Sequence, residues 1–173
     1  MIRQARVEDA ERMGEMLVAT WLAAHEGQMP HHLWEKRRRK WTPAVSARGW
    51  RGTLQEMAEG GDGRSCIYLA VTETGDIIGL CAAFAEAVQP QASVVALYVR
   101  QEQQRVGNGR LLLQTTFDHL QRGRIETVHI GVLAANTPAR RFYERMGGVL
   151  IGERSFDEEG TPLPEAVYGW RLK

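Results

Sequence analysis

One segment, residues 93–133, constrains the fold of this chain more than any other. Its first part, SVVALYV at 93–99, is an apolar run typical of a buried strand, and LLLQTTFDHLQ at 111–121 has the spacing of an amphipathic helix. The following ETVHIGVL, residues 126–133, alternates apolar residues as a second strand does. A strand that reaches the next strand through a helix runs parallel to it, so the segment predicts one parallel strand pair.

The remaining segments predict strands that pair mostly antiparallel. A hairpin signal, ETGD, joins two apolar runs before residue 88. The expected order is a strand at 2–6, a helix at 8–24, one or two short helices within 31–58, the two hairpin strands, the segment described above, a helix at 136–146 and two last strands at 149–156 and 165–172, with DEEGTPLP as their turn. This order predicts an α+β fold with a mixed sheet, in a single domain spanning residues 1–173.

Composition narrows the class of protein. Hydrophobic residues make up 43% and charged residues 25% of 173 positions, and the formal net charge is +1, so we expect a globular protein with no nucleic-acid partner. Cys66 and Cys81 stand in apolar runs and are expected to be buried free thiols, which favours a cytoplasmic location. No metal-ligand spacing, signal peptide or membrane-spanning run of about 20 residues is present.

The stretch QQRVGNGR lies at the junction between the strand at 93–99 and its helix. Gly107 and Gly109 allow close approach of a ligand, and the first amides of a helix have no internal partners, so the junction predicts an anion site. Arg105 and Arg110 add positive charge. A Walker A loop fits poorly, because Gly109 is followed by Arg110 and Leu111 rather than by Lys and Ser or Thr. A dinucleotide fingerprint also fits poorly, because Leu112 stands where it needs a third glycine.

Two spaced motifs carry a resemblance to a known family. Gln104-x-x-Gly107-x-Gly109 after ALYV resembles the coenzyme A signature of the GNAT (GCN5-related N-acetyltransferase) acetyltransferases. The later run LAANTPARRFYERMGG, with Asn136 seven residues before Tyr143, is similar to the family's second conserved region. The resemblance implies the GNAT fold: a twisted, mostly antiparallel sheet with one splayed parallel strand pair and helices on both faces.

The resemblance covers nearly the whole chain, strongest over residues 94–148 and weaker over 21–60. It implies that acetyl-CoA is the cosubstrate. No metal is expected, because His31 and His32 lack further ligands at a zinc spacing. Tyr143 would donate a proton to the leaving sulfur, although its helical spacing with Ala139 and Met146 also fits plain core packing. The family's usual donor to the thioester oxygen is the backbone N–H at Val99. The implied coenzyme-binding residues are Leu97, Tyr98, Val99, Arg105, Val106, Gly107, Asn108, Gly109, Arg110, Asn136 and Tyr143.

The general base departs from the family pattern. Some relatives carry a glutamate five residues before the motif asparagine, where this chain has Gly131, and others carry one near the position of Ser93. The remaining candidates are Glu86, which we prefer, His129 and His25. A water chain to bulk solvent would serve equally.

The expected activity is acetyl transfer to a primary amine of a small molecule, directly within a ternary complex. A protein N-terminus or lysine as acceptor stays open, and so does a non-catalytic acyl-CoA-binding or sensing domain. The basic run at 36–40 is interpreted as a solvated helix face, and the acidic run at 157–162 as a solvated turn. Four tryptophans would form either core or an apolar pocket for the amine: Trp21, Trp34, Trp41 and Trp50. Relatives often form dimers, so a homodimer is also an expectation.

Overall fold

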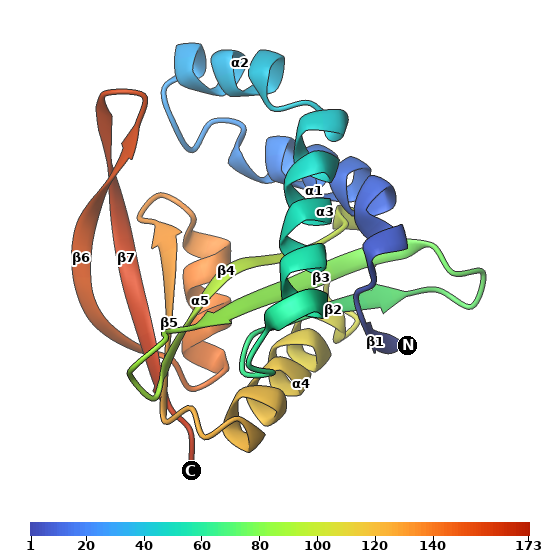
Figure 1. Ribbon diagram of the computed structural model, residues 1–173. Coiled ribbons are helices and arrows are strands. Elements are labelled where there is room, and N and C mark those ends of the chain that lie inside the picture. Colours follow the sequence, from blue (N-terminus) through green and yellow to red (C-terminus); the bar gives the residue numbers. More distant parts are fainter.

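The computed structural model describes all 173 residues, and its seven strands form one sheet in the order β1-β2-β3-β4-β5-β7-β6 (Figure 1). The strands are β1 (Ile2–Gln4), β2 (Cys66–Val71), β3 (Ile77–Ala85), β4 (Gln91–Val99), β5 (Thr127–Leu133), β6 (Val149–Glu158) and β7 (Thr161–Arg171). The helices are α1 (Ala10–His25), α2 (His31–Lys40), α3 (Pro43–Gly60), α4 (Asn108–Arg122) and α5 (Thr137–Arg145), with two short 3₁₀ turns at Val7–Asp9 and Gln101–Gln103.

The predicted parallel strand pair is present. Every neighbouring pair in the sheet is antiparallel except β4 and β5, which are parallel. Their pairing covers only Gln91–Val94 against Thr127–Ile130, and beyond these residues the two strands separate. The α+β fold class with a splayed parallel pair is therefore confirmed.

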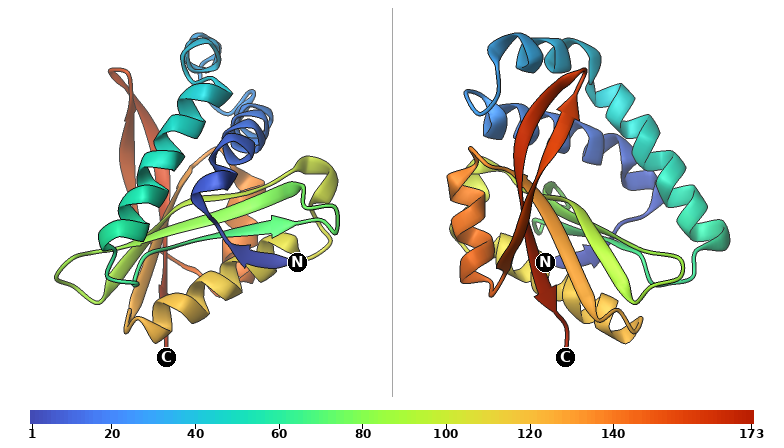
Figure 2. Two further views of the ribbon diagram at one scale, coloured as in Figure 1. Left: turned by 45° about the vertical axis from the view of Figure 1, so that its right-hand side comes forward. Right: turned by 90° about the vertical axis from the view of Figure 1, so that its left-hand side faces the viewer.

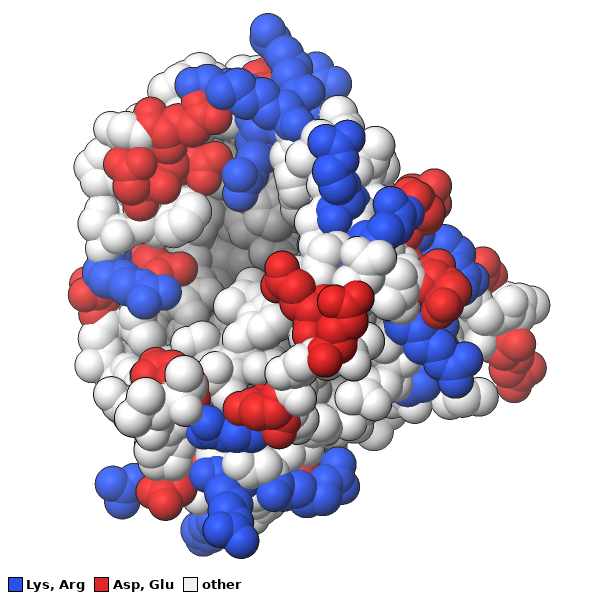
Figure 3. All heavy atoms as spheres, viewed as in Figure 1, with Lys and Arg blue, Asp and Glu red and all other residues white.

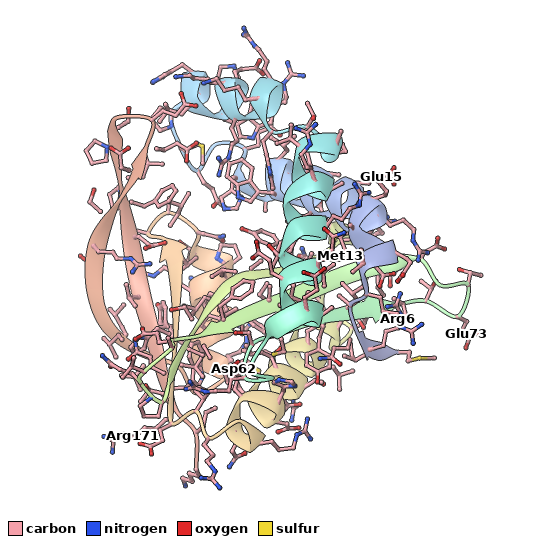
Figure 4. The ribbon with its side chains drawn as sticks, in the orientation of Figure 1. Arg6, Met13, Glu15, Asp62, Glu73 and Arg171 are labelled. Carbon is pink, nitrogen blue, oxygen red and sulfur yellow. The ribbon has the colours of Figure 1, made fainter.

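Helices cover both faces of the sheet (Figure 2). Alternate residues of β2 enter two separate cores: Cys66 and Ala70 join the core under α4 and α5, whereas Ile67 and Leu69 join the core under α1 and α3. We call these the α4–α5 face and the α1–α3 face. The helices are amphipathic, as Met13 on α1 illustrates by packing into the core while Glu15 is exposed (Figure 4).

The last hairpin differs from its prediction. The predicted eight-residue turn is in fact only Glu159 and Gly160, whose φ angles of +51° and +85° are typical of a two-residue type I′ turn. Pro162 and Pro164 suggested a loop, but both lie in β7. There β7 extends past its last pair with β5, at Glu165, and β6 is its only neighbouring strand, so residues without an N–H can be accommodated.

Candidate active site

The glycine turn after β4 leaves a run of backbone donors free. Gln104 Nε2 donates a hydrogen bond to the carbonyl of Val99 at 2.9 Å, which holds the turn against the end of the strand. None of the six backbone N–H groups from Arg105 to Arg110 donates a hydrogen bond within the protein. The helix dipole of α4 adds partial positive charge at the same place, so the turn can bind an anion with several phosphate oxygens.

Two residues of this turn have left-handed backbone angles. Gly107 is the N-cap of α4 at φ +95°, and Arg105 has φ +63°, which is rare for a residue with a side chain. A left-handed residue other than glycine costs about 1–2 kcal/mol. Strain of this kind persists where the surrounding structure requires it, and it is common at ligand-binding turns.

The free edge of β4 is the second element of the site. Arg100 N donates to Ile78 O on β3, so the antiparallel alternation directs the backbone groups of Leu97 and Val99 away from β3. On that side β5 has already separated, after Val94. Apart from the Val99 carbonyl, which accepts from Gln104 Nε2, the outward backbone groups of this segment are therefore free to pair with an extended ligand as another strand would.

A cavity of about 320 Å³ lies where β4 and β5 part. Tyr98 of β4, Gly131 of β5 and Tyr143 of α5 are among the residues that line it. Trp21 and His25 of α1 contribute to the same wall. The hollow is visible between the β6–β7 hairpin and the helices in Figure 3.

Asn136 and Tyr143 come from α5, as the motif spacing predicts. Asn136 caps the helix, with its Oδ1 accepting from Ala139 N at 3.2 Å, and its side chain lines the cavity. Two of the four tyrosines, Tyr68 and Tyr168, place their hydroxyls on protein partners, whereas the hydroxyls of Tyr98 and Tyr143 have none. A buried tyrosine normally finds a partner, so these two hydroxyls are free to bond to a ligand in the cavity.

Burial strongly affects both free tyrosines. It raises the pKa of Tyr98 to about 12 and raises the pKa of Tyr143 further above its ordinary value, with smaller contributions from neighbouring Tyr98 and Cys81. Tyr143 therefore keeps its proton throughout the neutral range. A protonated hydroxyl at this position can donate a hydrogen bond and, during a reaction, its proton.

The structure does not bring Glu86 to the cavity. Its Oε1 accepts from Gln91 Nε2 at 2.6 Å in the β3–β4 turn, at the start of β4. On β4 the cavity begins at Val94, and the three residue steps from Gln91 to Val94 span about 10 Å at about 3.3 Å each. The antiparallel direction of β3 and β4 thus places this carboxylate at the wrong end of the strand for the role predicted for it.

Of the other two predicted candidates, His25 lies in the cavity and His129 does not. His25 Nδ1 lies 2.8 Å from the carbonyl of Trp21, and because a carbonyl only accepts, the neutral ring keeps its hydrogen on Nδ1. Burial lowers the pKa of His25, and nearby Arg37 lowers it further. Nε2 is then an unprotonated acceptor at neutral pH.

The sequence reasoning missed a carboxylate that lies in the cavity wall. Glu165 of β7 lines the cavity, and its side chain covers Gly131 of the neighbouring strand. A Cβ atom at Gly131 would lie 2.5 Å from Glu165 Cδ, so the absence of a side chain at 131 makes the room. Nothing in the sequence pairs these two positions, because the contact depends on the register between β5 and β7.

The two charged runs close the far end of the cavity. Lys36 and Lys40 of α2 form ion pairs with Glu159 at the tip of the β6–β7 hairpin, and Arg37 lies 3.7 Å from Glu158. Basic and acidic side chains meet there in Figure 3, above the hollow. The basic run and the acidic turn are thus not two solvated surfaces, as predicted, but partners.

Arg37 also lies close to two of the tryptophans that the sequence suggested as an amine pocket. Its guanidinium lies 5.2 Å from the ring centroid of Trp21 and 5.4 Å from that of Trp41. These ring faces are therefore occupied by a cation of the protein itself. The guanidinium of Arg38 lies 5.9 Å from the ring centroid of Trp34, and Trp50 packs against the core under α1 and α3.

Fold and site together define a class: acetyltransferases that bind coenzyme A at a splayed pair of parallel strands. The model of the family described as "Acetyltransferase (GNAT) family" matches residues 21–148, more than half of the chain. The chain belongs to the GNAT acetyltransferase family.

Individual relatives are distant. The chain is 23% identical over 174 residues to the uncharacterized N-acetyltransferase YuaI of Bacillus subtilis, covering 98% of this chain and 91% of the relative. Among solved structures it resembles the PaiA N-acetyltransferase of Thermoplasma acidophilum in complex with coenzyme A, with a TM-score of 0.73, 19% identity and 96% of each chain covered. A ribosomal-protein-alanine N-acetyltransferase from Brucella melitensis also gives 0.73, at 17% identity and 99% coverage of each chain.

No helix of the structure is both long enough and apolar enough to cross a membrane.

Proposed function

We propose that this protein transfers the acetyl group of acetyl-CoA to the primary amine of a small molecule, by direct attack in a ternary complex. The observation that carries the proposal is the opening between β4 and β5, which joins two differently built sides. On one side lie the free amides of the α4 turn, and on the other lies the cavity under α1 and α2, which Tyr143 lines from the α4–α5 face.

The coenzyme would be held mainly by backbone groups. The amides from Arg105 to Arg110 would surround its diphosphate, and the free edge at Leu97 and Val99 would pair with the pantetheine arm. The N–H of Val99 points to the same side and is the donor available to the thioester oxygen as that oxygen becomes negative. Asn136, at the start of α5, would bond to the arm on its other side.

Tyr143 would complete the transfer on the sulfur side. Because burial keeps its hydroxyl protonated and no protein group accepts from it, the hydroxyl can give its proton to the departing sulfur. The lost proton is replaced by one of the two that the attacking nitrogen releases.

A small acceptor fits the cavity best. Its volume of about 320 Å³ is at the lower end of small-molecule pockets, and ion pairs between α2 and the β6–β7 hairpin close one end. A protein N-terminus would need an open path along that end. The likeness to a ribosomal-protein-alanine N-acetyltransferase, at 17% identity, supports the fold alone.

The test is a panel of primary amines offered with acetyl-CoA, with release of free thiol as the readout and calorimetry for coenzyme binding. We expect coenzyme binding and amine-dependent thiol release for small amines rather than for peptides. Binding without turnover for any amine would support a sensing domain instead. Absence of any affinity for acetyl-CoA or CoA would refute the proposal altogether.

A further inference from the structure

The two sides of the opening between β4 and β5 carry different side chains. Side chains alternate along a strand, so Ile130 and Val132 of β5 point into the core on the α4–α5 face, and Gly131 faces the opposite side. Glu165, which covers Gly131, therefore lies on the α1–α3 face, whereas Tyr143 lies on the α4–α5 face. A proton donor, the hydroxyl of Tyr143, and a proton acceptor, the carboxylate of Glu165, thus lie on opposite sides of the opening between β4 and β5.

The carboxylate of Glu165 is oriented from one side only. Its Oε2 forms an ion pair with Arg154, which stands directly opposite it on β6. Its Oε1 has no hydrogen-bond partner in the protein and is the atom nearest to the empty side-chain position at Gly131. The side chain is only 12% exposed, so the free oxygen is directed to the cavity rather than to bulk solvent.

We propose that Glu165 is the group that receives the proton of the acceptor amine, which deepens the function proposed above and rests on it. An alkyl ammonium with a pKa near 10.4 is almost wholly protonated at neutral pH and cannot attack. The ammonium would bind to Oε1 of Glu165 and give it one proton. The neutral nitrogen would then form the C–N bond on the thioester carbon, the C–S bond would break, and Tyr143 would protonate the sulfur.

The charges balance in this scheme. The nitrogen loses two protons in all, one to Glu165 before the attack and one after it, which restores the hydroxyl of Tyr143. Glu165 then releases its proton to solvent, so one ammonium and acetyl-CoA give one amide, one thiol and one free proton. Arg154 acts as a positioning residue that keeps the carboxylate turned to the cavity.

His25 is the competing group on the same face. Its Nε2 is unprotonated, but its ring is held by stacking on Trp21, one turn earlier in α1, at 4.3 Å between ring centroids. The ring centroid of His25 lies 6.2 Å from that of Tyr98. Glu165 is instead beside the edge of β5 where the strands part, next to the place of the thioester. The charged or titratable groups that face Glu165 are Arg154 of β6 and, across the cavity, Arg37, His25, Tyr98 and Tyr143.

The experiment compares Glu165→Gln with Glu86→Gln, a matched control outside the cavity, using the best amine of the panel. We expect Glu165→Gln to lower kcat/KM about 100-fold at neutral pH, a typical contribution of a general base, with unchanged affinity for CoA. The deficit should shrink toward pH 10, where bulk solvent deprotonates the amine. Glu86→Gln should match the wild type. His25→Gln should keep most of the activity, and a loss in this variant alone would assign the role to His25.

A relocation variant guards against simple misfolding. In Gly131→Glu/Glu165→Gly, the carboxylate returns to the same space from β5, because the side chain that would clash has been removed. We expect this double variant to recover at least tenfold over Glu165→Gly alone. Wild-type turnover with an unaffected Glu165→Gln, or no recovery on relocation, would overturn the inference and leave the proposed function standing. A wild type that binds CoA but acetylates no amine would overturn both.

Discussion

The α4–α5 face and the α1–α3 face of the opening between β4 and β5 are built in different ways. On the α4–α5 face the binding groups are consecutive backbone amides and two motif residues that lie within about 50 positions of one another. On the α1–α3 face the shape of the cavity depends on individual side chains from different elements: Arg37 with Glu158, Lys36 with Glu159, and Glu165 over Gly131.

This difference indicates which half of the site tolerates changes of amino-acid sequence. A backbone donor does not depend on its own side chain, so the coenzyme half needs only glycine at the strained positions and a correct helix start. The acceptor half depends on pairs of side chains, and changing either partner alters the cavity. A relative can therefore keep the first half and exchange the second.

The largest expected effect tests the α4–α5 face. Tyr143→Phe should lower kcat about 100-fold, because the departing sulfur loses its proton donor, while the affinity for CoA in calorimetry stays within twofold. Tyr68→Phe is the matched control, since its hydroxyl bonds to His119 away from the cavity, and it should leave kcat unchanged. Equal turnover of Tyr143→Phe and the wild type would remove Tyr143 from the chemistry.

A backbone change on the same face should act on binding instead. Gly107→Val forces a β-branched residue into φ +95°, at a cost of about 1–2 kcal/mol, so the turn should relax and the Kd for CoA rise about tenfold. Gly75→Val imposes similar strain at φ +87° in the β2–β3 turn and should lower only the Tm. If both variants bound CoA equally well, the glycine turn would not be the coenzyme site.

The α1–α3 face should respond more weakly to the loss of its ion pairs. Glu159→Lys should raise the KM for the amine about threefold, because exposed pairs contribute about 0.2–1 kcal/mol, and should leave CoA affinity unchanged. Restoring complementarity with Lys36→Glu and Lys40→Glu should return the KM. Glu73→Lys, in the β2–β3 turn, makes the same charge change away from the cavity and should have no effect on the KM.

The smallest effect concerns pH. Burial lowers the pKa of His25 in the folded protein, so below about pH 6.5 the unfolded chain takes up a proton more readily than the folded one. Stability from this group is fully present above about pH 6.5 and is lost as pH falls toward the folded pKa. Between pH 7.5 and pH 5, the Tm of His25→Gln should therefore fall less steeply than the Tm of the wild type. If the two proteins lost Tm equally over this range, burial would not lower the pKa of His25.

Local pattern was enough for most of the fold and for the α4–α5 face. The strand–helix–strand segment predicted the parallel pair, the motif asparagine predicted the start of α5, and the glycine turn predicted free amides, because helix starts and strand alternation are local properties. The last hairpin was misread since Pro162 and Pro164 looked like loop residues; only strand order reveals that they lie where β7 has a single neighbour.

What the sequence by itself determined is therefore the order of the elements, the splayed strand pair and the backbone donors at the start of α4. Only the tertiary structure decided which carboxylate reaches the cavity. Glu86 is excluded by the direction of β3, and Glu165 is brought in by the register between β5 and β7 and by the missing side chain at Gly131. The physical reason is that side-chain proximity across strands depends on pairing between residues far apart in the chain, which no local periodicity encodes.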